Sequence, residues 1–220
     1  MKRLFIILLI IILLFSCNKK TVLLPETDTK EITEILDVSP IYIFYDETKP
    51  DSTDFNRKNM ISTTNWLVNI DKRLTLKQIL PHLQYLQEKR SKDGMHKNEN
   101  AKNYFTCFNP EIQNLTFIEF TDVAFHDKSL EKYSSENSIV IDFNTHNKIT
   151  IINPNTNKII LKTEADYLLN SIEEVVTLEN IIYLNFNKTL SFQDYITYKS
   201  LLLRLDINNV ILSNDEFIYN

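Results

Sequence analysis

Glycine is almost absent from this sequence, in which Gly94 is the single example among 220 residues. Phosphate-cradling P-loops, dinucleotide-binding fingerprints and the G-x-S-x-G nucleophile elbow each require several glycines, because their backbone adopts positive φ or closely approaches a phosphate. The sequence therefore excludes these nucleotide-binding and hydrolase motifs. Asparagine, which tolerates left-handed backbone better than most residues, is abundant and is expected to supply the turns.

The chain also has few cysteines and no cluster of positive charge. Cys17 and Cys107 are the two cysteines, so modification of either one would leave no internal disulfide. The first 16 residues contain two of the 24 basic residues and no acid, so the remaining 204 residues carry a net charge of −7. Because nucleic-acid phosphates require clustered cations, we expect no nucleic-acid partner. We also expect no bound cofactor.

The N-terminus has the pattern of an export signal. Lys2 and Arg3 precede an uninterrupted apolar run, residues 4–15, which is shorter than the ~20 residues that a membrane-spanning helix requires. The run ends in Leu14-Phe15-Ser16-Cys17, which resembles the lipobox of bacterial lipoproteins. The resemblance implies that residues 1–16 are a signal peptide and that Cys17 becomes the N-terminus, acylated by palmitate or a similar chain. The alternative is an ordinary signal peptide whose cysteine is accidental.

Residues 17–39 are mainly polar and predict a lipid anchor followed by a flexible tether. Asn18-Lys19-Lys20, which follow the anchor, contain neither an aspartate nor an acidic cluster. By resemblance to the sorting rules of bacterial lipoproteins, this implies the periplasmic face of the outer membrane. Because the chain is acidic, it would be repelled by anionic lipid, so the acyl chains are expected to hold it there.

Beyond residue 40, runs of β-branched and aromatic residues alternate with helical patterns. Capping patterns predict helices that begin at Thr75, Thr163 and Ser191, and Pro81 predicts either a kink in the first helix or a later start. The strand–helix–strand order predicts an α+β fold with a mixed sheet. We expect an N-terminal half, residues 40–126, and a C-terminal ββαβαβ half, residues 138–220. The expected strands are 41–45, 66–70, 104–108, 115–120, 138–143, 148–152, 158–161, 181–186 and 209–212, with a loop at 48–63.

Two segments of these halves resemble each other. Residues 69–76 read Asn-Ile-Asp-Lys-Arg-Leu-Thr-Leu, and residues 185–192 read Asn-Phe-Asn-Lys-Thr-Leu-Ser-Phe. Each segment follows an apolar strand and precedes an amphipathic helix. The similarity indicates either a duplicated module or two ordinary junctions that share good capping chemistry.

Residues 149–215 resemble the periplasmic domain of the ExbD/TolR family. Residues 182–188, followed by Phe192 and Tyr195, are similar to that family's strand, polar residue and helix. The resemblance implies a hairpin followed by helix, strand, helix and strand, and it implies a cell-envelope setting. The chain lacks the family's transmembrane helix with its functional aspartate, so we expect no proton-driven motor role.

Candidate catalytic and metal-binding residues are few. Cys107 and a histidine could form a nucleophilic pair, but the apolar strand around Cys107 favours a buried thiol. His126 beside Asp122 and Asp127 could bind a metal ion, although no compact ligand motif is present. The remaining candidates have no motif around them: His82, His96, His146 near Asp142, Glu173-Glu174 and Asp215-Glu216. Apart from lipidation at Cys17, we therefore predict no catalytic, metal or cofactor site.

These observations predict a lipid-anchored cell-envelope protein that faces the periplasm and has a non-catalytic binding or scaffolding role. Its expected partners are the membrane, through the lipid, and an envelope protein or a second copy of itself. The exposed edge of the final strand, residues 209–212, is the expected contact surface. The alternative function is an envelope hydrolase that uses Cys107 or a His126 site.

Lipidation is directly testable in cells supplied with an alkyne fatty acid. The wild-type protein should incorporate the label, and Cys17→Ser should not, because the thiol that accepts the diacylglyceryl group is removed. The label is read by click chemistry after immunoprecipitation. Equal labelling of the two proteins would refute the lipoprotein interpretation.

Overall fold

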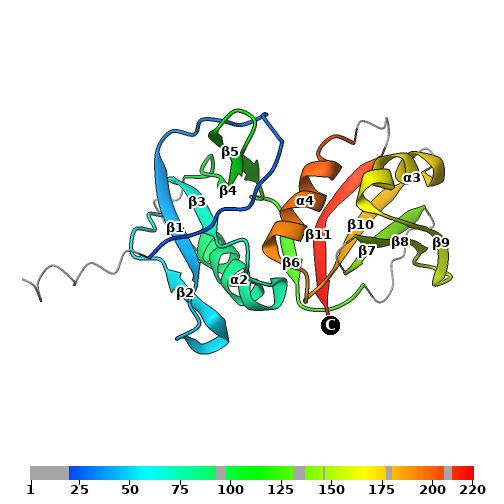
Figure 1. Ribbon diagram of the computed structural model, residues 1–220, viewed down its shortest axis with the longest axis horizontal. Coiled ribbons are helices and arrows are strands. Elements are labelled where there is room, and N and C mark those ends of the chain that lie inside the picture. The colour runs from blue at the N-terminus through cyan, green and yellow to red at the C-terminus, as the bar shows by residue number, and fades with distance from the viewer. Residues whose placement is uncertain (1–19, 93–97, 131–136, 146, 177–179, 206–209) are drawn as a thin grey trace, which may run out of the picture.

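The computed structural model describes residues 20–92, 98–130, 137–145, 147–176, 180–205 and 210–220. Within these ranges the protein contains two mixed β-sheets, one at each end of an elongated molecule, with helix α4 (Phe192–Leu202) between them (Figure 1). The expected α+β class with mixed β-sheet is confirmed. No described helix is long and apolar enough to cross a membrane.

The first sheet has the strand order β2-β1-β3-β4-β5. Its three central strands are parallel, and its two outer strands are antiparallel to their neighbours. Helix α2 (Leu76–Lys92) connects β3 to β4. The strands are β1 (Val38–Tyr45), β2 (Thr53–Asn56), β3 (Asn65–Ile70), β4 (Asn103–Asn109) and β5 (Asn114–Glu119), with a short 3-10 helix η1 (Pro50–Ser52) before β2.

The second sheet has the order β6-β11-β10-β7-β8-β9, in which the first four strands are parallel. Helix α3 (Leu168–Val175) follows β9, and α4 connects β10 to β11. The elements are β6 (Ala124–His126), β7 (Ser138–Thr145), β8 (Lys148–Asn153), β9 (Lys158–Thr163), the 3-10 helix η2 (Ala165–Tyr167), β10 (Ile181–Asn187) and β11 (Ile211–Tyr219). Strand β6, whose residues fall in the N-terminal half by sequence, pairs with β11 in this second sheet.

The two halves share one connectivity. In each half a first strand pairs with an antiparallel neighbour and with a parallel second strand, a helix follows, and a third parallel strand lies beside the second. Thus β1, β2, β3, α2 and β4 correspond to β7, β8, β10, α4 and β11. Strand β9 and helix α3 are additions to the second half. This correspondence agrees with the duplicated-module interpretation of residues 69–76 and 185–192.

The helix starts follow the capping chemistry at two of the three predicted positions. Ser191 caps α4 through a complete capping box, in which its side chain accepts from the backbone N–H of Asp194 and the Asp194 carboxylate accepts from the Ser191 N–H. At α2, the side-chain oxygen of Gln78 accepts from the backbone N–H of Thr75 at 2.8 Å. The helix begins at Leu76 and includes Pro81, so the later start that the proline suggested is wrong.

The prediction that a helix begins at Thr163 is also wrong. Thr163 is the last residue of β9, and its hydroxyl accepts a hydrogen bond from Ser171 at 2.8 Å. The chain then enters η2 after Glu164, and α3 begins only at Leu168, without a side-chain cap. The Thr163 hydroxyl therefore binds Ser171 and does not accept from the free backbone N–H groups at the start of α3.

Two other segments differ from the sequence-based expectations. Strand β2 lies within the expected loop at residues 48–63, because its four residues pair with the end of β1 although they carry no apolar alternation. The final strand, expected at residues 209–212, is β11 and extends to Tyr219. Residues 206–209 lie outside the described residues. The C-terminal part of β11 therefore lies inside the sheet, between β10 and β6.

The two strand–helix junctions contact each other through their backbones. Leu76 N donates to Leu190 O at 2.8 Å, and Phe192 N donates to Leu74 O at 2.7 Å. Thr75 and Ser191 face each other at the centre of this short antiparallel bridge. Leu74 and Leu76 of the first segment correspond to Leu190 and Phe192 of the second, so the two hydrogen bonds are equivalent to each other. The two similar segments are therefore related by an approximate two-fold axis.

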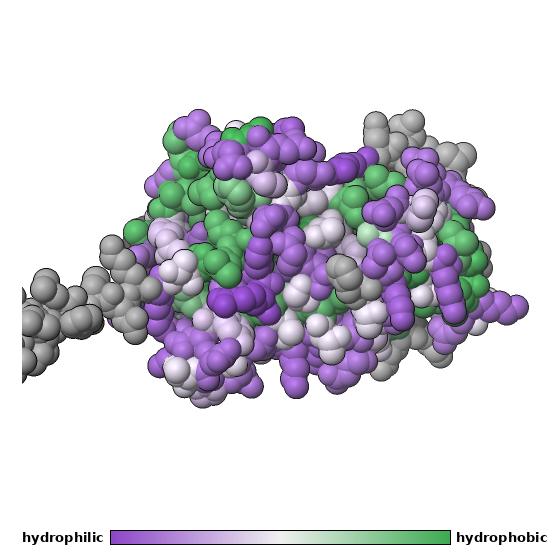
Figure 2. Space-filling model, viewed as in Figure 1, coloured by the Kyte–Doolittle hydropathy of each residue, from purple (hydrophilic) through white to green (hydrophobic). Residues whose placement is uncertain are grey.

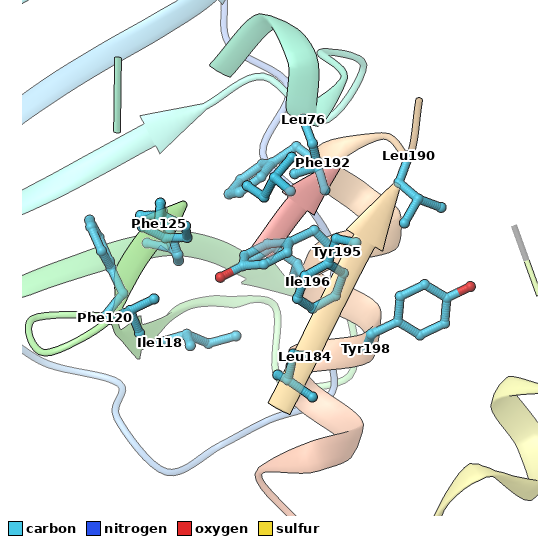
Figure 3. Packing of buried hydrophobic residues seen from close by; sticks show 14 of the residues in the cluster. Leu76, Ile118, Phe120, Phe125, Leu184, Leu190, Phe192, Tyr195, Ile196 and Tyr198 are labelled. Atoms are coloured by element: carbon cyan, nitrogen blue, oxygen red, sulfur yellow. The ribbon is translucent and has the colours of Figure 1, made fainter. Parts of the chain in front are cut away.

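One continuous hydrophobic core spans both halves. Helix α4 is buried on several sides, and its rings contact both sheets: Tyr195 packs against Phe105 of β4 at 5.9 Å and against Phe186 of β10 at 5.0 Å between centroids. Figure 3 shows Phe192, Tyr195 and Tyr198 of α4 among apolar residues of both halves. Because a fully buried large apolar side chain stabilises the fold by about 1.5–3 kcal/mol, α4 contributes strongly to holding the halves together.

Replacing Ser191 by Ala should lower the free energy of unfolding by about 0.5–2 kcal/mol, because it removes the side-chain oxygen that binds the Asp194 N–H. Chemical denaturation followed by circular dichroism measures the change. Thr197→Ala, at an exposed interior position of the same helix, is the control and should have little effect, since Ala favours helix. An equal loss in both variants would contradict the assigned cap.

Candidate functional site

The first described residues, 20–37, form a strap that is packed against the protein body, where a flexible tether was expected. Lys20 Nζ lies 2.8 Å from a carboxylate oxygen of Asp46. Pro25 and Thr27 are buried. The strap forms backbone hydrogen bonds at separate points along its length: Leu23 with Lys72, Pro25 and Thr27 with Phe108, and Ile32 with Phe117. The tether interpretation is therefore corrected for residues 20–37, and residues 17–19 lie outside the described residues.

The strap also binds helix α4 of the second half. The buried hydroxyls of Thr27 and Ser200 are 2.6 Å apart. The Gln193 side chain binds the backbone of Glu26 at both N–H and carbonyl, at 2.8 and 2.9 Å. In Figure 1 the strap passes from β1 across the molecule to α4 and β5, and then returns to the start of β1. One N-terminal segment thus connects both halves.

A buried carboxylate receives the strap where it crosses the first junction. Asp71 accepts from Leu23 N at 3.2 Å and from the Arg73 guanidinium at 2.8 Å. Burial favours the neutral acid, but the hydrogen bonds from Arg73 and Leu23 outweigh it and hold the pKa of Asp71 below its ordinary value. Asp71 is therefore a charged attachment point for the strap.

Cys17 lies outside the described residues, and Cys107 is completely buried in β4. Burial raises the pKa of the Cys107 thiol far above its usual range, because the thiolate would lose its solvation. A thiol in this environment is neither ionised nor accessible to a substrate. The structure thus contradicts Cys107 as a nucleophile.

The surroundings of His126 differ from the metal site that the sequence suggested with Asp122 and Asp127. Its Nε2 lies 2.6 Å from Asp215 Oδ1, and its ring stacks on Phe217 at 4.9 Å between centroids. Asp127, a proposed neighbour in the site, instead pairs with Lys188. Among the described residues no three His, Cys, Asp or Glu side chains come close enough together to hold a metal ion. His96 and His146 lie outside the described residues.

The carboxylate pairs do not form acid–base sites. Glu173 and Glu174 are both exposed on α3. Asp215 and Glu216 point to opposite faces of β11: Asp215 contacts His126, whereas Glu216 is fully buried beneath α4. Asp142 is also buried, and this burial raises the pKa of its carboxyl.

A cavity of about 690 Å³ lies where the first turn of α2 approaches the second half. His82 and Thr53 line it, with the His82 Nε2 and Thr53 Oγ1 atoms 3.3 Å apart. Burial and the nearby Arg57 lower the pKa of His82. Within the described residues no carboxylate hydrogen-bonds to the other ring nitrogen, so this pair lacks the third group that orients a catalytic base.

A buried ionic cluster that the sequence did not predict lies between α4 and β11. Lys199 Nζ and Tyr195 Oη donate to the two carboxylate oxygens of Glu216, at 2.5 and 2.7 Å. Burial, followed by the Glu216 charge, raises the pKa of Tyr195 well above its ordinary value, so Tyr195 stays a donor.

The equivalent positions in the first half are apolar: Ile79 for Tyr195, Leu83 for Lys199 and Phe105 for Glu216. The similarity between residues 69–76 and 185–192 was the signal that could have located this difference.

The expected contact edge at residues 209–212 is only partly open. Strand β6 covers the outer side of β11 at residues 215–217, and β10 covers the other side. Within the described residues, the outer side of Ile211 and Leu212 has no paired strand, and Ile211 is 62% exposed. The longer open edge of this sheet is β9.

Comparison with known proteins assigns no family to the chain. No family model, no curated protein and no solved structure matches it. Function therefore has to be argued from the strap, the buried groups and the surface described above.

Removal of one member of the buried ion pair should strongly destabilise the fold. Lys199→Met leaves the Glu216 carboxylate buried without its cation, and a broken buried pair costs about 3–5 kcal/mol of unfolding free energy. The double variant Lys199→Met/Glu216→Gln should recover much of this loss, because neither side chain is then charged. Chemical denaturation of the wild type, both single variants and the double variant measures the coupling between them.

The exposed pair between Lys102 and Glu119, 2.9 Å apart, is a matched control. Its double-mutant cycle should give a much smaller coupling energy, because water screens both charges. Equal coupling in the two cycles would show that burial does not strengthen the Lys199–Glu216 pair.

Proposed function

We propose that the protein is a lipid-anchored, periplasm-facing cell-envelope protein, placed on the outer membrane, that binds a partner and catalyses no reaction. The observation that carries this proposal is the docked strap. Lys20, only three residues after Cys17, is already bound to the body. Three extended residues span at most about 11 Å, so acyl chains on Cys17 would hold the folded domain directly against the bilayer.

The contacts of the candidate catalytic groups support binding over catalysis. The thiol of Cys107 is buried and un-ionised, and the imidazole of His126 is occupied by Asp215 and Phe217. The hydrolase alternative therefore lacks an accessible nucleophile at Cys107, and at His126 no described serine, threonine or cysteine side chain hydrogen-bonds to the imidazole.

The order of elements supports the envelope setting. From β8 onward the chain runs hairpin, helix, strand, helix, strand, which is the order implied by the resemblance of residues 149–215 to the ExbD/TolR periplasmic domain. A shared order of elements concerns the fold, and it does not transfer the family's motor activity. The part retained in the proposal is a membrane-tethered domain that acts through contacts.

The strap and the binding role are tested together with a cysteine pair at two contacting hydroxyls. In Thr27→Cys/Ser200→Cys the sulfur atoms replace oxygens 2.6 Å apart, so a disulfide should form spontaneously in an oxidising compartment. Maleimide–polyethylene glycol labelling of membranes, with and without reductant, measures it. The partners that co-purify in mild detergent should be the same as for the wild type, because the proposed function uses the docked state.

Two further variants separate this proposal from the alternative. Cys107→Ser and His126→Asn should retain the same co-purifying partners. Thr27→Cys alone is the control for disulfide formation. Loss of partners on locking the strap, or loss of a hydrolytic activity in a folded Cys107→Ser or His126→Asn protein, would overturn the proposal.

A further inference from the structure

Strand β9 (Lys158–Thr163) forms the open edge of the second sheet. It pairs with β8 on one side, and within the described residues no strand pairs with its other side. The other edges are shorter or covered: β2 has four residues and β6 three, while the Phe117 N–H of β5 donates to the carbonyl of Ile32 in the strap. A register shift at Ile160 interrupts the pairing of β9 with β8, so the outward N–H and C=O groups on either side of Ile160 are the ones available to an added strand.

The side chains of β9 are unusually exposed for an apolar strand. Ile159 is 54% exposed and Ile160 43% exposed, and Tyr167 in the following η2 is 64% exposed. Figure 2 shows apolar surface among polar side chains at the right-hand end of the molecule, where Figure 1 places β8 and β9. Exposed large apolar side chains on an unpaired edge are typical of a surface that a partner covers.

The charged residues of strands β8 and β9 themselves are all lysines, and the first acidic residue after them is Glu164. Lys158 and Lys162 are exposed at either end of the apolar centre, and Lys148 lies on the neighbouring strand β8. None of the three forms an ion pair with any residue that the structure describes, whereas Lys20, Lys72 and Lys102 all do. Lysines without an ion pair among the described residues also occur elsewhere, at Lys49 and Lys58, but here three of them lie on two adjacent strands that carry no acidic residue, and such an edge complements an anionic partner.

A small cavity beside β9 offers a place for an acidic side chain. The cavity is about 350 Å³, and both Lys148 and Lys162 line it, together with the amides of Asn144 and Asn147. Glu164 also lines it, but it is bound to the Asn147 amide at 3.2 Å. A carboxylate entering the cavity would meet two lysines that carry no other ion pair within the described residues.

The same charges disfavour a second copy of this chain as the occupant. If two β9 strands paired antiparallel about Ile160, Lys158 of each would lie opposite Lys162 of the other. Like charges placed directly opposite each other destabilise a strand pair. A strand with an apolar centre and acidic ends complements the edge in both respects.

We propose that β9 docks a β-strand of an envelope partner protein whose apolar centre is flanked by acidic residues, by addition to the edge of the second sheet. This inference rests on the binding role proposed above and names the surface and the partner chemistry. In Figure 1 β9 lies at the opposite end of the molecule from β1 and β2, where Lys20 is bound. A domain anchored near Lys20 would present β9 away from the bilayer.

Fluorescence anisotropy with the full-length lipidated protein in detergent tests the proposal. The probes are fluorescein-labelled Glu-Val-Thr-Val-Thr-Glu and the same peptide with both glutamates replaced by lysine. The wild type should bind the acidic peptide and not the basic one. Lys158→Glu/Lys162→Glu should weaken acidic-peptide binding by about tenfold, the change expected from losing two charge pairs, and should bind the basic peptide instead.

Lys49→Glu/Lys58→Glu changes the net charge equally at exposed residues beside β2 and is the matched control. It should leave both affinities unchanged. Equal effects of the two charge reversals, absence of acidic-peptide binding, or self-association that Lys158→Glu/Lys162→Glu abolishes would each overturn the β9 assignment. If peptide binding fails while partners still co-purify, only β9 is wrong; if no partner co-purifies at all, the proposed binding role itself fails.

Discussion

Four backbone hydrogen bonds between the strand–helix junctions, with Leu76 N to Leu190 O and Phe192 N to Leu74 O at their centre, fix the relation of the two halves. They bring the first turns of α2 and α4 together. Each helix then contacts the other half: Phe105 of β4 packs against Tyr195, and the α2 side chain of Gln84 donates to Phe125 O at 3.2 Å. Without this bridge each helix would lose part of its apolar cover, which explains why one core extends through both sheets.

The approximate symmetry makes the differences between the halves informative. Where the first half places Ile79, Leu83 and Phe105, the second places Tyr195, Lys199 and Glu216. The apolar set shows that this architecture does not require an ion pair at these positions. A buried pair rarely adds net stability over apolar residues of similar size, but an incorrect partner for it is strongly destabilising. The ionic set therefore distinguishes α4 from α2 and favours a single arrangement of two similar halves.

The strap changes how an anchor at Cys17 would act. A free segment of 20 or so residues could span several tens of Å, because each extended residue adds about 3.3–3.6 Å. With residues 20–37 bound to the first sheet and to α4, the reach is limited to the few residues before Lys20. A partner must then come to the domain. The open edge of β9, at the far end of the molecule, is where such a partner would find unpaired backbone.

Local chemistry was sufficient for many of the elements. The β-branched and aromatic runs located nine of the eleven strands, although the final strand proved much longer than its apolar start, and Ser191 with Asp194 located the start of α4. The pattern failed at Thr163, whose hydroxyl is bound by Ser171 from the following helix. It also failed at β2, where Phe55 is the only apolar residue among four and the segment becomes a strand because β1 lies beside it.

The sequence by itself determined the export-signal pattern, the absence of glycine-dependent sites and the similarity of residues 69–76 and 185–192, because each depends on residue type and spacing along the chain. The tertiary structure alone decided that residues 20–37 are bound, that Glu216 is paired with Lys199, and that β9 rather than the end of β11 is the longer open edge. Each of these depends on contacts between residues far apart in the chain. A polar segment has the same composition whether water or a distant strand satisfies its backbone, so only the fold distinguishes a tether from a strap.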